Sequence, residues 1–492
     1  MKLKKKKVLK PITLLSLGYF FTILIGTVLL MLPEASATGE RASFLDSLFT
    51  ATSATCVTGL TVNTTALNWS MFGQIVIICL IQIGGLGFMT LITLLFMIFG
   101  KKIGIYNRTV LMQSAGSYNI SEVTVLIKRI ILGTLLFEGL GALILSLEFS
   151  KTMEMSQAIY YGVFHSISAF CNAGFDIVSL TGDSLVQYSG NYVVLITIMA
   201  LIIIGGTGFI VWSDMLDSKF KFNKFQLHTK LVLVFNTLIF VLGAALFYVF
   251  EFSSLSQSTV NYDFSFSEQI LNSFFLSVSP RTAGFNAVDL TALTSSSKLL
   301  SIVLMVIGGN SGSTAGGLKV TTLVIVVANL ISSARGNDKV VLYNRKVDDK
   351  VIKQSGALFI SYLAIIVCAT MLITAFEQFA FEDVLFEVTS AIATVGCTMG
   401  LSAGCASPVT KVILIILMYA GRLGALALFS LFVKRKNELN RSKKMATEKK
   451  DVYAYYVSPI VCVVFLQTDD IVRTSPEQEV GGEYRDDWDF FD

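Results

Sequence analysis

The chain has 492 residues, of which 53% are hydrophobic and only 15% are charged, and its formal net charge is +4. A soluble protein of this length has about a quarter of its residues charged, so these values exclude a soluble globular protein. Apolar runs long enough to cross a bilayer, about 20 residues each, recur along the chain and predict an all-α polytopic membrane protein.

Signatures of an enzyme are absent from the sequence. The seven cysteines show no CxxC spacing, His165 and His228 are the only histidines, and neither HExxH nor GxSxG occurs. We therefore expect no catalysis and no cofactor in this chain, and we expect no nucleic-acid partner.

The N-terminus starts with MKLKKKKVLK, which is too basic to be buried and is expected in the cytoplasm. The apolar run at 11–33 follows it. This run is longer than the core of a signal peptide, so we interpret it as a retained first membrane helix.

Four similar polar stretches then interrupt the apolar runs, and they align on Gly59, Gly174, Gly284 and Gly396. They are TSATCVTGL (52–60), SISAFCNAGF (166–175), LSVSPRTAGF (276–285) and VTSAIATVGC (388–397). A serine lies six residues before the glycine in three stretches, and Val278 has that place in the third. A second glycine motif follows at 83–88, 204–209, 307–312 and 419–424, and its first glycine lies 25, 31, 24 and 25 residues after the aligned glycine. Two motifs that recur four times in one order indicate an internal repeat.

Each repeat predicts the same succession of elements. An apolar helix comes first, at about 11–32, 121–149, 229–251 and 355–380. A segment too short to span a bilayer ends at the glycine stretch, at about 43–55, 156–170, 266–279 and 382–393. A second apolar helix follows, at about 71–99, 191–216, 298–333 and 410–433. This order is typical of a re-entrant pore loop.

The predicted fold therefore has eight transmembrane helices and four re-entrant pore helices around a pseudo-fourfold pore. Its parts are a basic cytoplasmic N-terminus (1–10), four pore repeats (11–100, 121–217, 229–335 and 353–436) and a cytoplasmic tail of unknown role (437–492).

The basic residues predict the orientation in the membrane. With the N-terminus inside, Lys319 and Arg422 fall within spans, and 31 of the 38 lysines and arginines fall in the N-terminus, inner loops and tail. The remainder lie on the outer side: Arg41, Lys151, Arg281, Lys298 and Lys411. Since basic loops stay in the cytoplasm, both termini are predicted to be cytoplasmic and the four glycine stretches to lie on the outer side.

Non-helical backbone at membrane depth is tolerated where protein or water surrounds it. Four such stretches around one axis could ring a dehydrated cation with carbonyl oxygens, and glycine suits them because it adopts positive φ easily. For any single glycine, close helix packing is an equally good interpretation. The candidate filter residues are Val57, Thr58, Gly59, Asn172, Ala173, Gly174, Thr282, Ala283, Gly284, Thr394, Val395 and Gly396.

The strings TSATCVTGL, CNAGFD, PRTAGFN and ATVGCTMGLS resemble the membrane subunit of the Ktr potassium uptake system, in the Trk/Ktr/HKT superfamily, over about residues 10 to 436. The resemblance implies a homodimer in the bacterial cytoplasmic membrane. It also implies a cytoplasmic ring of RCK-type regulatory subunits, which would bind the nucleotide (ATP/ADP or NAD). In this family a glycine in the first filter, here Gly59, is associated with potassium and a serine there with sodium.

The run GGNSGSTAGGLK (308–319) interrupts the second helix of the third unit. Its five glycines should unwind the helix, since each costs about 1 kcal/mol relative to alanine. It is not a phosphate-binding loop, because Lys319 follows Leu318 and precedes Val320. The resemblance implies a mobile loop that obstructs the pore beneath the filter: Gly308, Gly309, Asn310, Ser311, Gly312, Ser313, Thr314, Ala315, Gly316 and Gly317.

Arg422 lies in an apolar run, where a charge should face protein or a water-filled cavity. One interpretation is a structural ion pair or a snorkelling side chain. The other, implied by the resemblance, is an arginine beside the pore that holds the loop or repels cations.

The inner loops at 101–113, 217–230 and 334–350 are basic, and they suit anionic lipid headgroups or the regulatory subunit. Two other classes of protein remain open from the residues alone. One is a secondary carrier, which would favour inverted repeats, and the other is a membrane-embedded enzyme or receptor.

Overall fold

The computed structural model describes residues 11–87, 123–180, 182, 184–253, 264–337, 339–343, 345–403 and 407–424. The basic N-terminus, the inner loop at 101–113 and the tail at 437–492 lie outside these residues. The described part is almost entirely helical, with one antiparallel hairpin of β1 (Val341–Leu342) and β2 (Arg345–Lys346).

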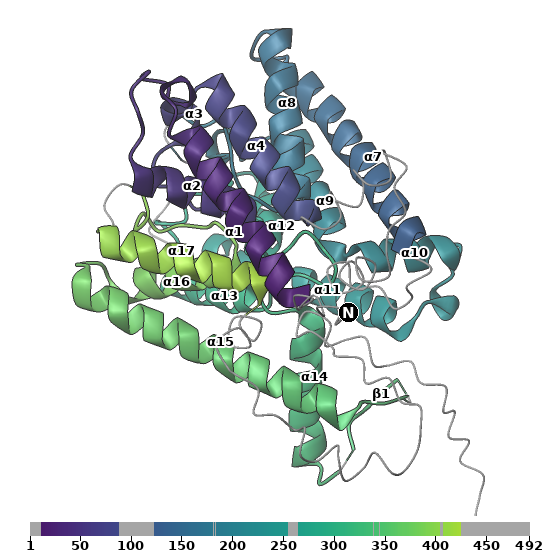
Figure 1. The fold of residues 1–492 in the computed structure, drawn as a ribbon. Helices are drawn as coiled ribbons and strands as arrows, with labels where there is room; N and C mark the ends of the chain where they lie inside the picture. The colour runs from purple at the N-terminus through teal and green to yellow at the C-terminus, as the bar shows by residue number, and fades with distance from the viewer. Residues whose placement is uncertain are drawn as a thin grey trace, which may run out of the picture.

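In the described residues, four helices of 20 to 28 residues are each followed by shorter helices (Figure 1). In chain order they are α1 (Pro11–Leu30), α2 (Phe44–Cys56), α3 (Thr65–Asn68), α4 (Met71–Leu86), α7 (Val123–Phe149), α8 (Met155–Phe170), α9 (Tyr192–Thr207), α10 (Phe209–Asp217), α11 (Leu227–Phe247), α12 (Phe266–Val278), α13 (Ser295–Val306), α14 (Val320–Ala334), α15 (Asp349–Phe376), α16 (Phe381–Ala393) and α17 (Pro408–Leu423). A π-helical turn (Tyr248–Phe252) extends α11.

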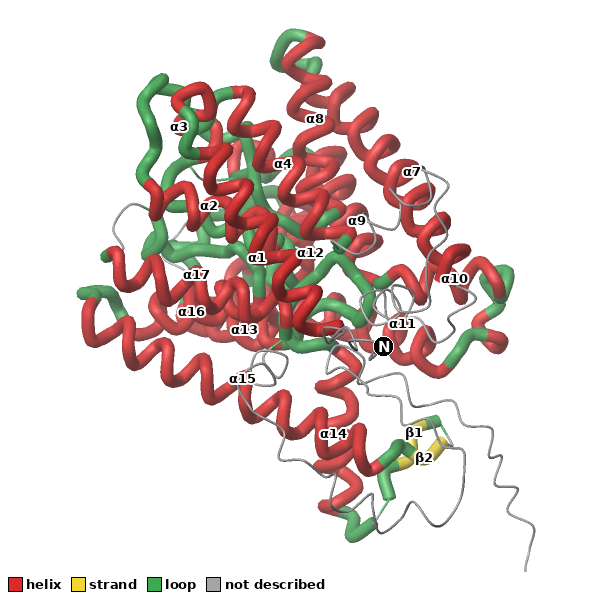
Figure 2. Tube along the Cα trace, in the orientation of Figure 1, coloured by secondary structure: helices red, strands yellow, loops and turns green. Residues whose placement is uncertain are grey.

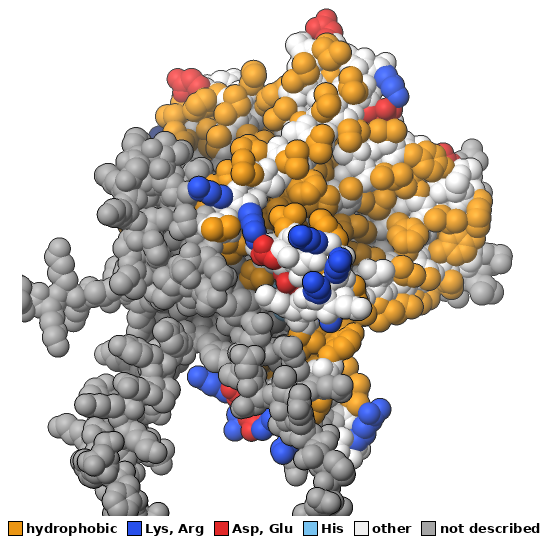
Figure 3. Space-filling model, turned by 90° about the vertical axis from the view of Figure 1, so that its right-hand side faces the viewer, with side chains coloured by type: hydrophobic (Ala, Val, Ile, Leu, Met, Phe, Trp, Pro, Cys, Tyr) orange, Lys and Arg blue, Asp and Glu red, His pale blue; other side chains and the backbone are white. Residues whose placement is uncertain are grey.

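Within the described residues, four helices are long and apolar enough to cross a membrane: α1, α7, α11 with its π turn, and α15. The bent pair α9 and α10 would make a fifth span. Leucine and isoleucine side chains such as Leu132 and Ile360 remain exposed on their outer faces. Figure 3 shows hydrophobic side chains spread over one face of the molecule, with Lys and Arg side chains near its centre and in its lower part. An apolar lateral surface of this kind suits contact with lipid.

A short helix precedes each of the four glycine stretches, namely α2, α8, α12 and α16, and each packs against the long helix before it. Side-chain caps fix where two of them begin. The Ser43 hydroxyl accepts a hydrogen bond from Asp46 N, and Ser265 and Glu268 form a reciprocal capping box at the start of α12. With 13 to 16 residues, these helices are too short to cross a bilayer. Figure 2 shows the loops that follow them in the interior of the helical body.

The second helices of two units are broken. The continuous helix predicted at 191–216 is wrong, because α9 and α10 meet at Gly208 with a bend of 85°. Gly208 has a φ of 106°, which side chains other than glycine rarely adopt. In the third unit, α13 ends at Val306 and α14 begins at Val320, which confirms that the glycine-rich run interrupts the predicted helix at 298–333.

Candidate functional site

The chain leaves each short helix through the same backbone conformation. Val57, Asn172, Thr282 and Thr394 have φ values of 58°, 59°, 73° and 52°, which is uncommon for residues other than glycine. The aligned glycine two positions later also has a positive φ in each stretch: Gly59 (94°), Gly174 (69°), Gly284 (77°) and Gly396 (100°). The predicted filter stretches therefore share one local geometry.

A serine side chain fixes this turn in the first and fourth stretches. The Ser53 hydroxyl accepts a hydrogen bond from Gly59 N at 3.1 Å, and the Ser390 hydroxyl accepts one from Gly396 N at 3.1 Å. Both serines lie six residues before the glycine, as the alignment predicts.

The second and third stretches use their serine differently. The hydroxyl of Ser168 donates to the carbonyl oxygen of Phe175 at 2.7 Å, and the hydroxyl of Ser279 donates to that of Phe285. The alignment placed Val278 where the structure uses Ser279. The sequence analysis missed this serine because the third stretch is one residue shorter between its serine and its glycine.

The first two glycines lie against the backbone of the next stretch in the chain. A Cβ atom on Gly59 would come closer than 3.0 Å to the carbonyl oxygen of Ala173. A Cβ atom on Gly174 would lie 2.6 Å from the carbonyl oxygen of Ala283. Cβ atoms essentially never approach other atoms this closely, so glycine is required at both positions.

The other two glycines close the circle. A Cβ atom on Gly284 would overlap the carbonyl oxygen of Val395, and one on Gly396 would overlap that of Thr58 in the first stretch. Each glycine therefore meets the carbonyl group that precedes the glycine of the next stretch, and the fourth stretch returns to the first. The sequence-predicted filter residues are thus brought together in one ring.

The ring opens onto a cavity of about 440 Å³ that all four aligned glycines line. Asp176 and Asp289 also line this cavity. The Asp176 carboxylate accepts a hydrogen bond from Ser179 N at 3.1 Å, and that of Asp289 accepts one from Thr291 N at 2.9 Å. Two carboxylates at this cavity favour the approach of cations.

A second circle of contacts joins the units farther from the axis. In each unit the start of the second helix contacts the start of the next unit's short helix. The four side-chain pairs are Tyr160–Gln74 (2.9 Å), Tyr192–Ser267 (2.8 Å), Lys298–Asp383 (3.1 Å) and Lys411–Asp46 (2.8 Å). The last pair joins the fourth unit to the first, so this circle is also closed.

Three glycines of the second motif pack against the last turn of a short helix. A Cβ atom on Gly84 would overlap the carbonyl oxygen of Thr55, and one on Gly205 would overlap that of Phe170. A Cβ atom on Gly421 would likewise overlap the carbonyl oxygen of Ile392. These glycines allow the second helix to approach the short helix closely, as small residues do in membrane proteins.

The glycine-rich loop between α13 and α14 contacts the end of α8 through Thr314. The Thr314 hydroxyl donates to the carbonyl oxygen of Phe170 at 3.1 Å, and Thr314 N donates to that of Gly205 at 3.3 Å. On the same side, Asn310 Nδ2 donates to the carbonyl oxygen of Gly206 at 2.8 Å. The loop is therefore held against the second unit.

The bend at Gly208 provides a further attachment for this loop. Phe209 begins α10 directly after the bend, and its N–H donates to the carbonyl oxygen of Gly312 at 2.8 Å. A Cβ atom on Gly208 would lie 2.9 Å from the carbonyl oxygen of Ser311. The broken helix, which the sequence did not predict, is thus part of the surface against which the loop packs.

The far end of the loop lies next to the fourth stretch. A Cβ atom on Gly316 would overlap the hydroxyl of Thr394, and one on Gly317 would lie 3.1 Å from the carbonyl oxygen of Ala393. The loop of the third unit therefore contacts the ends of the short helices of both neighbouring units, α8 and α16.

Arg422 on α17, in the fourth unit, contacts both the loop of the third unit and the first unit. Its Nη1 donates to the carbonyl oxygen of Thr314 in the loop at 2.5 Å. Its Nη2 donates to the carbonyl oxygen of Gly84 and lies 3.4 Å from that of Gly85. Arg422 forms no ion pair within the described ranges, so here its contacts are with backbone carbonyl groups.

Two other basic residues also bind carbonyl groups of the loop. Lys319 Nζ donates to Ala315 O at 2.9 Å. Arg281 is buried; its Nη2 donates to Gly308 O at 2.9 Å, and its guanidinium covers the ring of Phe240. The filter stretch itself carries Arg281 into the interior.

The apolar helical fold and the ring of backbone carbonyl groups define a polytopic membrane protein of the cation-transporter class. The TrkH family of cation transport proteins matches residues 17–443, and the chain belongs to this family.

Two relatives are similar to this chain over most of both sequences. The potassium/sodium uptake protein NtpJ of Enterococcus hirae is 40% identical over 439 residues, which are 88% of this chain and 95% of that protein. The Ktr system potassium uptake protein B of Bacillus subtilis is 38% identical over 88% of this chain and 96% of its own. The crystal structure of the potassium transporter TrkH from Vibrio parahaemolyticus shares the fold, with a TM-score of 0.67 at 18% identity, over 88% of this chain and 87% of that one.

Proposed function

We propose that this protein moves potassium ions into the cell across the cytoplasmic membrane, through the ring formed by its four glycine stretches. The main support for this proposal is the closed circle of contacts, in which each aligned glycine lies against a backbone carbonyl group of the next stretch. Carbonyl oxygens arranged around an axis can replace the hydration shell of a cation. The short helices α2, α8, α12 and α16 end at the ring, and their C-terminal dipoles favour a positive charge there.

The proposed membrane architecture has eight spans and four re-entrant pore helices around a pseudo-fourfold axis. The first span of each unit is α1, α7, α11 and α15, and the second spans contain α4, α9 with α10, α13 with α14, and α17. Both termini would then lie in the cytoplasm. The two closed circles of contacts between successive units support this arrangement.

The loop at Gly308–Gly317 is proposed to be the gate. It would lie across the axis, and it donates hydrogen bonds to the second unit and accepts one from Arg422. These attachments are hydrogen bonds to backbone carbonyl groups, which can be exchanged for others during opening.

Potassium is proposed as the preferred ion because Gly59 occupies the first filter position. The relatives' names include both potassium uptake and potassium/sodium uptake, so the choice between these ions is the finer part of the proposal. A side chain at position 59 would displace the carbonyl group of Ala173 and so change the ring.

The protein is further proposed to act as a homodimer with a cytoplasmic ring of RCK-type subunits that bind ATP/ADP or NAD. The name of the Bacillus subtilis relative describes a Ktr system, which supports a multicomponent assembly. The basic inner loops at 217–230 and 334–350 would contact this ring or anionic lipid.

The test of transport is ion flux into liposomes that contain the purified protein. We expect uptake of rubidium, as a tracer for potassium, to be inhibited by external potassium and much less by external sodium. Protein-free liposomes are the control. Absence of rubidium uptake would contradict the proposed function.

A further inference from the structure

Glu387 is a buried acidic residue for which the proposed filter and gate have no role. It lies on α16, nine residues before Gly396, and its side chain is fully buried. In the described part of the chain it forms no ion pair. A buried charge is costly unless hydrogen bonds compensate it, so the partners of this carboxylate indicate what it does.

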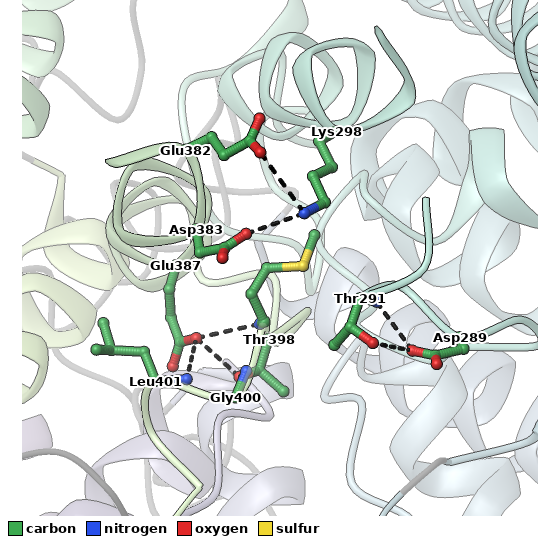
Figure 4. A network of polar contacts seen from close by, with 10 residues as sticks. Asp289, Thr291, Lys298, Glu382, Asp383, Glu387, Thr398, Gly400 and Leu401 are labelled. Atoms are coloured by element: carbon green, nitrogen blue, oxygen red, sulfur yellow. Dashed lines mark hydrogen bonds and ion pairs between the residues drawn. The ribbon is translucent and has the colours of Figure 1, made fainter. Parts of the chain in front are cut away.

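Four hydrogen bonds reach the Glu387 carboxylate, and all come from the segment that follows the fourth filter stretch. Oε2 accepts from Thr398 Oγ1 at 2.8 Å and from Met399 N at 3.2 Å. It also accepts from Leu401 N at 3.1 Å, and Oε1 accepts from Ser402 N at 2.6 Å. Figure 4 shows the carboxylate at the centre of this network. Since both oxygens accept N–H groups, the ionised carboxylate fits this site.

The segment that Glu387 holds is part of the wall of the cavity above the ring. Thr398 and Gly400 line that cavity together with Gly396. Gly400 has a φ of 92°, and its N–H donates to the Thr398 hydroxyl at 2.9 Å. Glu387 therefore fixes, from the protein side, the backbone that continues directly from the filter.

The second stretch has a similar support from a different residue type. His165 lies nine residues before Gly174 and is fully buried. Its Nδ1 lies 2.7 Å from the carbonyl oxygen of Tyr161, which assigns the proton to Nδ1 and leaves Nε2 as an acceptor. Ile177 N lies 3.5 Å from Nε2, and Ile177 is the third residue after the glycine, as Met399 is in the fourth stretch.

The first and third stretches differ at this position. Phe275, nine residues before Gly284, has no polar group. Thr50, nine residues before Gly59, makes no hydrogen bond to the following segment in the described structure. The two supports are therefore on opposite sides of the ring.

We infer that Glu387 is a positioning residue that fixes the fourth filter stretch and thereby sets ion selectivity, with His165 as the weaker support opposite it. The inference rests on the proposed filter function. In a ring of carbonyl groups, discrimination between potassium and sodium depends on where the oxygens are held. Because Glu387 binds three backbone N–H groups directly beyond Gly396, it limits the movement of that stretch.

The test replaces Glu387 with glutamine, which keeps the size of the side chain but turns one acceptor into a donor. We measure the ratio of rubidium to sodium uptake in liposomes. The ratio is expected to fall at least about tenfold, the effect of losing one charge-assisted hydrogen bond. Glu382→Gln on the same helix is the matched control, since that carboxylate is 46% exposed and lies 4.0 Å from Lys298. Its ratio should equal that of the wild type.

A general loss of folding would lower the rubidium and sodium fluxes in proportion and leave their ratio unchanged. An unchanged ratio in Glu387→Gln would therefore show that Glu387 does not set selectivity, and it overturns the inference. If Glu387→Gln does not fold, the same uptake ratio is measured for Thr398→Val, which removes one of the four hydrogen-bond donors and keeps the carboxylate. A smaller fall in the ratio supports the inference, and a wild-type ratio overturns it. Failure of the wild type to take up rubidium would instead contradict the proposed function.

Discussion

Replacement of Arg422 by alanine is expected to release the loop at Gly308–Gly317, the proposed gate. The guanidinium group donates one hydrogen bond to Thr314 in the loop and another to Gly84 in the first unit. Alanine removes both and leaves two carbonyl groups without these donors. Thr314 itself would keep the two hydrogen bonds that it donates to the second unit.

The size of the effect follows from the hydrogen bond between Arg422 and the loop. A hydrogen bond to a charged group contributes about 1.5–3 kcal/mol, and a shift of 1.4 kcal/mol changes an equilibrium about tenfold. The bond to Thr314 fixes the loop directly, whereas the bond to Gly84 orients the arginine. If open loops limit transport, the rubidium flux per protein should therefore rise at least about tenfold.

The assay is rubidium uptake into liposomes at equal amounts of monodisperse protein. Arg422→Lys is the matched control, since it keeps the charge but cannot form the same fork of hydrogen bonds. We expect an intermediate flux for lysine if the arginine holds the loop, and a wild-type flux if it only repels cations. Unchanged flux and unchanged regulation in Arg422→Ala would refute the reasoning.

Two further predictions concern packing, the first within the second unit and the second between the first and fourth units. Gly205→Ala should lower the melting temperature and the yield of active protein, because its Cβ would overlap the carbonyl oxygen of Phe170, at a cost of about 1–3 kcal/mol for overpacking. Gly139→Ala on α7 is the control; its Cβ meets nothing within 4 Å, so thermal unfolding should show equal or slightly higher stability. A double-mutant cycle of Lys411→Gln and Asp46→Asn should give a coupling of about 0.5–1 kcal/mol for this partly exposed ion pair, and zero coupling would mean that the pair does not join the first and fourth units.

The positions of the four glycine stretches could be predicted from the sequence because each combines a local requirement with a fixed spacing. Gly59 and Gly396 need positive φ and close approach, and no other residue meets both needs. The interruption of the third unit was also predictable, since five glycines in one short run destabilise a helix regardless of its surroundings.

Other features depend on contacts that the pattern does not contain. The glycines at 205, 206 and 208 weaken the helix, but the bend at Gly208 also depends on the Phe209 N–H contact with Gly312 in a loop from another unit, which the sequence does not reveal. Ser279 was missed because a glycine-based alignment cannot detect a stretch that is one residue shorter. Nothing in the sequence of α16 singled out Glu387. However, Glu387 and His165 both lie nine residues before an aligned glycine, and this shared spacing could have suggested a shared role.

The most direct test of the central claim is the selectivity of Gly59→Ser, measured as the ratio of rubidium to sodium uptake in liposomes beside wild type. Gly39→Ser is the matched control, since Gly39 also has a positive φ but its Cβ would meet nothing within 4 Å. If Gly59 belongs to a four-part carbonyl filter, wild type and Gly39→Ser prefer rubidium, and Gly59→Ser admits sodium more readily. A Gly59→Ser protein that transports rubidium with wild-type selectivity would contradict the account.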